Sequence, residues 1–162
     1  MSGTKITTLA SLKPKVKIFQ ENGKKVVFSN GCFDILHYGH IKYLEDAKHK
    51  GDYLIVAVNS DSSIRKIKAQ NRPIIGQSDR LKTIAALACV DFVVLFNEDN
   101  PLRLIRALRP DILIKGSDWN KNKIIGADFV KSYGGKVITV DLVKGRSTSA
   151  IIKKIVKDFS RQ

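Results

Sequence analysis

Five short apolar runs alternate along the chain with stretches of helical periodicity, and this rhythm restricts the fold more than any other feature. The runs cover residues 25–30, 53–60, 91–96, 111–117 and 136–142. Runs that are apolar throughout, rather than at every second position, are typical of strands buried on both faces. Strands that alternate with helices form a parallel sheet. The sequence therefore predicts a single α/β domain with a doubly wound, Rossmann-like parallel sheet.

The stretches between these runs predict the helices. They cover residues 40–51, 61–69, 77–90, 100–110, 124–135 and 147–159. Residues 1–25 predict an N-terminal helical extension that closes in a turn, and residues 26–162 are assigned to the domain itself. A length of 162 residues suits one domain with a full hydrophobic core.

The composition narrows the class of protein. The formal net charge is +14, which indicates either an anionic partner or a solvated basic surface. No apolar run approaches the length of a membrane span, and the N-terminus lacks the apolar core of a secretion signal. Cys32 and Cys89 have neither metal-like nor disulfide-framework spacing. These features predict a reduced cytoplasmic protein without a membrane partner.

Unusual residues gather at the carboxyl ends of the predicted strands. They occur in the segments SNGCFD, NSD, FNED, KGSDW and DLVKGRST. In doubly wound folds, ligands bind outside these strand ends, at the point where strand order reverses. The sequence therefore predicts a ligand site along this edge of the sheet.

Two of the three histidines, His37 and His40, lie three residues apart where the first predicted strand gives way to a helix. At that spacing both imidazoles can face the same side. A helix N-terminus supplies free N–H groups and partial positive charge, and Gly39 leaves room for a bulky anion. The pattern favours a cradle for phosphate charge that grows during a reaction.

Other readings of the histidine pair stay open from the residues alone. A zinc site would need a third ligand, and no Cys or His stands at a metal-like spacing. One histidine acting as a general base, or a pair with only a structural role, also fits the pattern. The segments around the pair decide between these readings.

Those segments resemble the cytidylyltransferase-like nucleotidyltransferases with an HxGH motif. The segments NGCFDILHYGHIKYL, VAVNSD, NRPI, VDFVVLFNEDNPLRLI, RPDILIKGSDW, GGKVITV and STSAIIKKI are similar to the branch that makes ADP-heptose from D-glycero-β-D-manno-heptose 1-phosphate. The resemblance runs from about residue 25 to residue 158 and is to the stand-alone form, without the sugar kinase to which this domain is often fused.

The resemblance implies a reaction and its partners. ATP and the sugar 1-phosphate would give ADP-heptose and pyrophosphate, for the lipopolysaccharide core. A phosphate monoester is already an anionic nucleophile, so catalysis would consist of positioning and charge stabilisation. Mg²⁺ is the expected cofactor, entering with ATP. The resemblance also implies a homodimer and gives no role to nucleic acid.

The resemblance assigns roles to residues of the matching segments, with no metal ligand among them. Three residues are expected to be catalytic: His37, His40 and Lys68. The residues expected to bind the nucleotide are Gly31, Cys32, Phe33, Asp34, Gly39, Lys66, Gly116, Asp118, Arg146, Ser147 and Thr148. The residues expected to bind the sugar phosphate are Arg72, Asn59 and Asp61.

Several of these roles have alternatives. Asp34 could orient its loop, sit near the metal or cap a turn, and Arg72 could be a solvated loop arginine. Ser147 and Thr148 could cap the last helix as well as meet the triphosphate. Trp119 could stack on a base or pack against the protein.

Two other functions are considered, a cytidylyltransferase and a nucleic-acid-binding protein. Glycerol phosphate cytidylyltransferases carry an arginine where this chain has Leu142. This difference disfavours a cytidylyltransferase that acts on glycerol 3-phosphate or another small phosphorylated alcohol, but that enzyme stays the alternative. The charge of +14 motivates a basic nucleic-acid-binding protein without catalysis. The chain has no basic stripe with interleaved aromatic residues, which disfavours that second rival.

Overall fold

The computed structural model describes residues 5–68, 70–118 and 123–159. Its centre is a six-stranded, all-parallel sheet with the order β1-β4-β3-β2-β5-β6. The strands are β1 (Ile6–Thr7), β2 (Val26–Gly31), β3 (Tyr53–Asn59), β4 (Phe92–Phe96), β5 (Ile112–Gly116) and β6 (Lys136–Val140). The predicted doubly wound α/β fold is confirmed.

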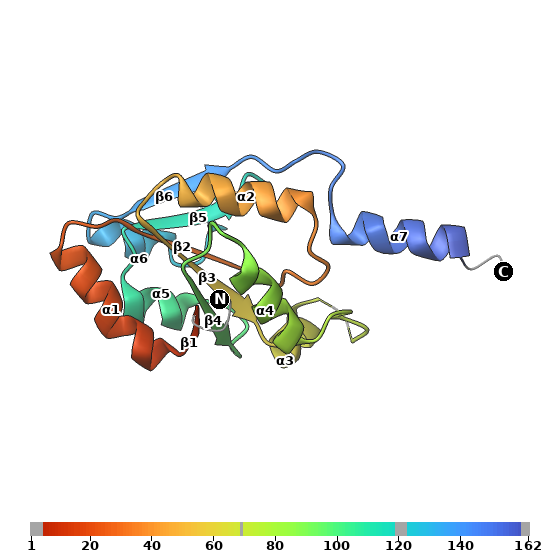
Figure 1. The fold of residues 1–162 in the computed structure, drawn as a ribbon, viewed down its shortest axis with the longest axis horizontal. Coiled ribbons are helices and arrows are strands. Elements are labelled where there is room, and N and C mark those ends of the chain that lie inside the picture. The colour runs from red at the N-terminus through yellow and green to blue at the C-terminus, as the bar shows by residue number, and fades with distance from the viewer. Residues whose placement is uncertain (1–4, 69, 119–122, 160–162) are drawn as a thin grey trace.

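Helices cover both faces of this sheet (Figure 1). They are α1 (Leu9–Glu21), α2 (Tyr38–Lys48), α3 (Asp61–Ile67), α4 (Gln77–Ala86), α5 (Leu102–Leu108), α6 (Ala127–Ser132) and α7 (Thr148–Phe159). One buried cluster joins α1, α5 and α6 to the face that contains Phe28, and a second joins α2 and α4 to the face that contains Val27. Successive residues of a strand therefore pack into the cores on opposite faces of the sheet. This explains why the strands are apolar throughout.

The strand order reverses beside β2. From β2 the chain winds outward through β3 and β4, and later returns to the other side of β2 as β5 and then β6. Pairing of β2 with β3 runs up to Gly31 opposite Val58, whereas the β2–β5 register joins Val27 to Ile112 and Phe28 to Leu113. The carboxyl ends of β2 and β5 therefore border the crevice in which doubly wound folds bind ligands. We call this place the split of the sheet.

The N-terminal segment differs from the predicted extension. A helix does form there, but Leu12 and Val16 are fully buried in the core. Before it, Ile6 and Thr7 form β1, which pairs with Val93 and Val94 of β4 at the edge of the sheet. The boundary predicted at residue 26 therefore does not separate two folded units in the part of the chain that the structure describes. Two residues are too few to show a strand period, so β1 could not be predicted from the sequence.

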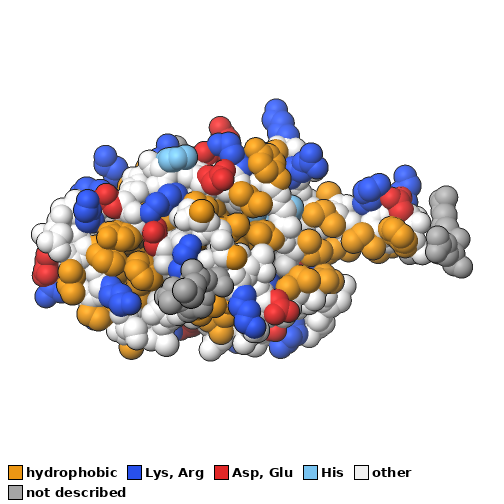
Figure 2. Space-filling model, in the orientation of Figure 1, with side chains coloured by type: hydrophobic (Ala, Val, Ile, Leu, Met, Phe, Trp, Pro, Cys, Tyr) orange, Lys and Arg blue, Asp and Glu red, His pale blue; other side chains and the backbone are white. Residues whose placement is uncertain are grey.

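Helix α7 extends away from the rest of the domain (Figure 1). None of its residues is buried, and Ile155, Val156 and Phe159 are 49%, 57% and 69% exposed. Figure 2 shows hydrophobic side chains along this helix, with Lys or Arg side chains on another side. In the described part of the chain, no helix combines the length and the apolar character needed to cross a membrane.

Candidate active site

A cavity of about 620 Å³ opens at the split of the sheet. Its walls come from the ends of β2, β3 and β5, the starts of α2 and α7, and the loop after α3. Most of the residues singled out from the sequence line it: Gly31, Cys32, Phe33, Asp34, His37, Gly39, His40, Asn59, Lys68, Arg72, Gly116, Asp118, Arg146, Ser147 and Thr148. The fold thus brings together segments more than a hundred residues apart, because each follows the carboxyl end of a strand.

The two histidines lie at the start of α2. His37 is the extended residue before the helix, and His40 belongs to its first turn. Their rings stack with centroids 3.9 Å apart, and the Phe33 ring meets His40 edge-on at 5.4 Å. A Cβ at Gly39 would lie 3.0 Å from the His37 ring and 3.2 Å from Cβ of Arg146. Only glycine fits this position without displacing a neighbour, so Gly39 permits the stacked arrangement.

Both imidazoles are neutral near pH 7. Burial, with a smaller contribution from His37, lowers the pKa of His40 to about 4. Burial and then the charge of Arg146 lower the pKa of His37. The Nδ1 atoms of both rings are buried and have no hydrogen-bond partner among the described residues. Since buried polar atoms in folded proteins normally have a partner, the pair is suited to receive polar atoms of a ligand.

The start of α7 meets the histidine turn, as expected from the sequence. Thr148 Oγ1 donates a hydrogen bond to the Ile35 carbonyl at 3.4 Å, across 113 residues of sequence. Ser147 Oγ accepts from the Ala150 N–H at 3.1 Å and so caps the helix. The hydroxyls and the helix N-terminus therefore stand at one wall of the cavity.

Asp34 orients a loop at the cavity wall. Its carboxylate accepts from Arg72 Nε at 2.6 Å and from the N–H groups of Ile74 and Ile75 at 2.8 Å each. Burial alone would raise the pKa of Asp34, but those two N–H donors and the Arg72 guanidinium outweigh it and hold the pKa below its ordinary value. These contacts support the interpretation that Asp34 orients its loop. The Asp34 carboxylate also holds Arg72 at the cavity wall.

Two residues predicted to bind ligands lie elsewhere. The Asp61 carboxylate accepts from Nη2 of the buried Arg80 at 2.8 Å, and Arg80 also donates to the Cys32 carbonyl. A buried guanidinium requires such a carboxylate, so Asp61 supports the loop after β2 and does not line the cavity. Lys66 is also absent from the lining, since its exposed ammonium faces Asp99 at 3.6 Å.

Gly116 ends β5 at the opposite wall, and Asp118 follows two residues later. A Cβ at Gly116 would lie 2.5 Å from Asp118 Oδ1 and 3.0 Å from the Leu142 side chain, so this close turn requires glycine. The Asp118 side chain is exposed beside the cavity. Trp119 lies outside the described residues. Within the described ranges, no three His, Cys, Asp or Glu side chains cluster in a way that could hold a metal.

The sequence profile of the Cytidylyltransferase-like family matches residues 28–158 of this chain. The chain belongs to this family. The matched region begins in β2 and ends near the end of α7, so it contains every wall of the cavity.

Curated relatives of this cytidylyltransferase-like chain extend well beyond it. It is 49% identical over 158 residues to the bifunctional protein HldE of Syntrophotalea carbinolica, covering 98% of this chain and 32% of the relative. The HldE protein of Geotalea uraniireducens is 51% identical over 154 residues, covering 95% and 31%. The chain thus spans about a third of the length of these relatives.

Two solved structures share the fold of this chain. A lipopolysaccharide core biosynthesis protein from Thermoplasma volcanium is 32% identical with a TM-score of 0.63, and the match covers 76% of this chain and all of that one. A pantoate-beta-alanine ligase from Francisella tularensis, solved with an ATP species and β-alanine, has a TM-score of 0.64 at 18% identity, covering 97% of this chain and 79% of that one. The second similarity concerns the fold alone.

Sequence reasoning missed several residues of the cytidylyltransferase-like cavity. Lys115 in β5 is 9% exposed, lines the cavity, and donates from Nζ to the Asn30 carbonyl at 3.3 Å. Tyr43 of α2 also lines it and bonds Ser29 Oγ at 2.7 Å. A charged residue inside an apolar run was the available signal for Lys115, because strands buried on both faces rarely contain lysine.

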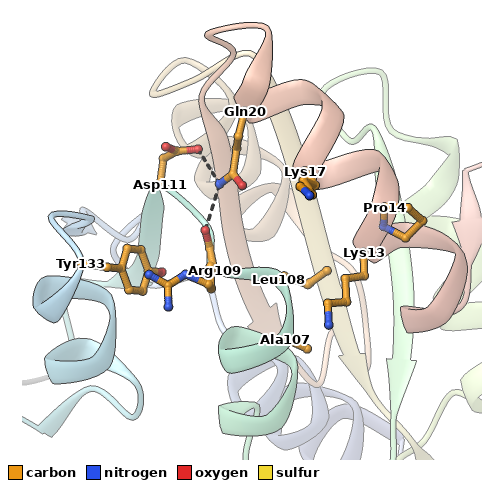
Figure 3. Close-up of a pocket in the computed structure, with 9 residues that line it drawn as sticks. All are labelled: Lys13, Pro14, Lys17, Gln20, Ala107, Leu108, Arg109, Asp111 and Tyr133. Carbon is orange, nitrogen blue, oxygen red and sulfur yellow. Dashed lines mark hydrogen bonds between the residues drawn. The ribbon is translucent and has the colours of Figure 1, made fainter.

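A second hollow, of about 580 Å³, lies beside α1 at the other end of β5 (Figure 3). Gln20 Nε2 donates to the Arg109 carbonyl at 2.9 Å and to Asp111 Oδ2 at 3.1 Å. The Arg109 guanidinium lies 4.3 Å from the centre of the Tyr133 ring. The hollow and the split lie at opposite ends of β5, and neither His37 nor His40 lines the hollow.

Proposed function

We propose that this nucleotidyltransferase transfers AMP from ATP to D-glycero-β-D-manno-heptose 1-phosphate, giving ADP-heptose and pyrophosphate for the lipopolysaccharide core. The observation that carries the proposal is the meeting of the histidine turn with the start of α7 in one cavity. The segments that meet there are among those in which the sequence resembles the ADP-heptose-forming branch. The similarity to the bifunctional HldE proteins supports the same pathway.

The proposed step is an in-line displacement at the α-phosphorus of ATP. An oxygen of the sugar phosphate forms the new P–O bond while the bond to the bridging oxygen breaks, and that oxygen leaves with pyrophosphate. The attacking phosphate is already anionic, so no protein nucleophile is required. The protein contributes by holding the two phosphates in line.

The neutral histidines would act as hydrogen-bond donors in this step. Each imidazole has one N–H, and charge develops on the α-phosphate oxygens as the bond to pyrophosphate breaks. Donors that are already oriented by stacking stabilise that charge without reorganising. His37 and His40 are therefore the proposed catalytic pair.

The other predicted residues would bind the two substrates. Lys68 and Arg72 lie on the wall after α3 and supply positive charge for phosphate groups. Ser147, Thr148 and the start of α7 would receive the nucleotide phosphates opposite them. Asn59, whose Nδ2 donates to Ser63 Oγ at 2.9 Å, is buried at the end of β3 with a side chain at the cavity.

Mg²⁺ is proposed to enter with ATP. This ion keeps several waters and is held through one or two carboxylates together with substrate phosphates, so it needs no protein cluster. The exposed Asp118 carboxylate at the cavity wall fits that need. The ion would neutralise phosphate charge. The homodimer implied by the resemblance stays a prediction.

A nucleotide panel tests the proposal. The protein is incubated with ATP, CTP, GTP or UTP, each with heptose 1-phosphate or glycerol 3-phosphate, and pyrophosphate release is measured. We expect ATP with heptose 1-phosphate to be turned over far faster than any other pair. Equal or faster turnover of CTP with glycerol 3-phosphate would assign the chain to the rival reaction instead.

A further inference from the structure

Lys115 is a charged residue inside a strand that is buried along its whole length. All five residues of β5 are buried, and Lys115 itself is only 9% exposed. Its Nζ donates to the Asn30 carbonyl at the end of β2, 3.3 Å away. The ammonium therefore bridges the two strands that border the split, and its side chain forms part of the cavity.

Burial of this ammonium has an energetic cost. Lysine is therefore rarely buried in a strand, and a buried lysine that lines a cavity is a candidate for binding a ligand. Burial lowers the pKa of Lys115 to about 8, and the nearby Cys32 and Asp118 offset this only in part. A phosphate bound at the same place would favour the charged form and raise the pKa again.

Other cations of the cavity stand in different surroundings. The Arg72 guanidinium is bound to Asp34 at 2.6 Å. Lys68 and Arg146 are exposed. Lys115 alone among these four is both buried and placed between the strand ends. Exposed cations attract phosphates from solution, whereas a buried cation acts on the group that reaches the bottom of the cavity.

We propose that Lys115 binds a phosphoryl group at the bottom of the cavity, either the phosphate of the sugar substrate or the α-phosphate of ATP. The inference rests on the proposed function, since it takes the reacting phosphates as the ligands. A lysine ammonium is a compact point charge and can contact an oxygen that shifts during the reaction. Lys115 thereby becomes a substrate-binding residue, although the sequence analysis gave roles only to Gly116 and Asp118 of the segment KGSDW.

Binding calorimetry on Lys115→Met tests the inference. Methionine keeps the length of the side chain and removes its charge. ATP and heptose 1-phosphate are titrated separately at pH 7, and we expect about 10- to 100-fold weaker binding of at least one of them, the range for a charged hydrogen bond. The ligand whose affinity falls identifies the source of the phosphoryl group. Affinities within twofold of wild type for both ligands would overturn the inference.

Lys13→Met is the matched control, because Lys13 lies in the hollow beside α1. It removes the same charge from the same residue type, so any general effect of net charge on anion binding appears in both variants. We expect unchanged affinities for both ligands. An equal loss in the two variants would show a non-specific charge effect and would overturn the role of Lys115.

The pH dependence of binding distinguishes phosphate contact from a structural role. Wild-type affinity for the identified ligand should be constant below pH 8 and fall up to tenfold per pH unit above it, as the Lys115 ammonium loses its proton in the protein without ligand. Lys115→Arg should remove this decline, since a guanidinium stays charged. A wild-type decline that persists in Lys115→Arg would assign the titration to another group. This comparison also serves if Lys115→Met does not fold.

These titrations require no turnover, so the inference and the proposed reaction can fail separately. If the wild-type protein binds ATP but releases no pyrophosphate, the proposed reaction is wrong. A loss of binding in Lys115→Met would still support the phosphate contact of Lys115. If the wild-type protein and Lys115→Met turn over the substrates at the same rate, the proposed phosphate contact is wrong and the proposed reaction is supported. Wild type that binds neither ligand would overturn both.

Discussion

The cavity at the split and the hollow beside α1 are close in volume, about 620 and 580 Å³, but their polar groups are in different states. In the cavity, the Nδ1 atoms of His37 and His40 are buried without a partner among the described residues. In the hollow, Gln20 bonds both Arg109 and Asp111 (Figure 3). Two spaces of similar size therefore differ in what a ligand could add to them.

The difference has a physical origin in the sheet. The carboxyl ends of β2 and β5 border a place where strand order reverses, and helix N-termini converge there. At the other end of β5, the Asp111 carboxylate already accepts from the Val26 N–H at 2.9 Å as well as from Gln20. These polar groups stabilise the fold, whereas the Nδ1 atoms of His37 and His40 at the split can take a ligand atom as a partner. Volume alone would not separate the two places.

The largest expected effect belongs to the histidines. His37→Ala or His40→Ala should lower kcat by roughly 10²–10³, the scale of losing one transition-state donor. Steady-state kinetics with ATP and heptose 1-phosphate measure this, and Tyr133→Phe in the hollow is the control. Full activity in both histidine variants would contradict the assignment of catalysis to the cavity at the split rather than to the hollow beside α1.

A pair of aspartates compares the same chemistry in the two places. Asp34→Ala and Asp111→Ala each remove a carboxylate that accepts backbone N–H bonds. Both should lower the free energy of unfolding, by about 2–4 kcal/mol for the more buried Asp34. Only Asp34→Ala should also lower kcat/KM, because it releases Arg72 from the cavity wall. Urea unfolding and kinetics of the folded variants give both values, and an equal loss of activity would contradict the account.

The pH dependence of the free energy of unfolding should show the effect of the lowered pKa of His40. Its folded-state pKa, about 4, is depressed from 6.5, so the folded state binds a proton less readily than the unfolded chain. This contribution to stability is complete above pH 6.5 and is lost as the pH falls toward 4. His40→Gln should show a smaller decline than wild type over that window in urea unfolding. Identical declines would mean that His40 is not buried as described.

A smaller effect is expected at the start of α7. Thr148→Ala should weaken ATP binding by about 1–2 kcal/mol, the value of a charge-assisted hydrogen bond. Calorimetry at a temperature where the variant is fully folded separates this from any loss of helix stability. An unchanged ATP affinity would mean that the hydroxyl only holds the helix to Ile35.

The smallest effect is expected in the hollow. Lys17→Met, alone or with Lys13→Met, should change kcat and KM less than twofold, because both lysines are exposed and distant from the split. A tenfold change in either constant would give the hollow a role in the reaction.

The sequence predicted most of the fold, because buried strands and amphipathic helices leave strong periodic signals. It also predicted that the start of α7 meets the histidine turn, since both follow carboxyl ends of parallel strands. It missed β1, whose two residues carry no period. It misplaced Asp61, because a buried partner such as Arg80 cannot be recognised before the packing is known. It did not identify Lys115, because residues 111–117 were interpreted as a buried strand and the lysine within them was not considered as a ligand-binding residue.

A crystal structure of the protein with bound ADP-heptose would show directly whether the split of the sheet is the active site. We expect the product to occupy the split, with its diphosphate between the His37–His40 turn and the start of α7, and with Lys115 in contact with a phosphate oxygen. A product bound in the hollow beside α1, or at the split with its phosphates away from both histidines, would contradict this expectation.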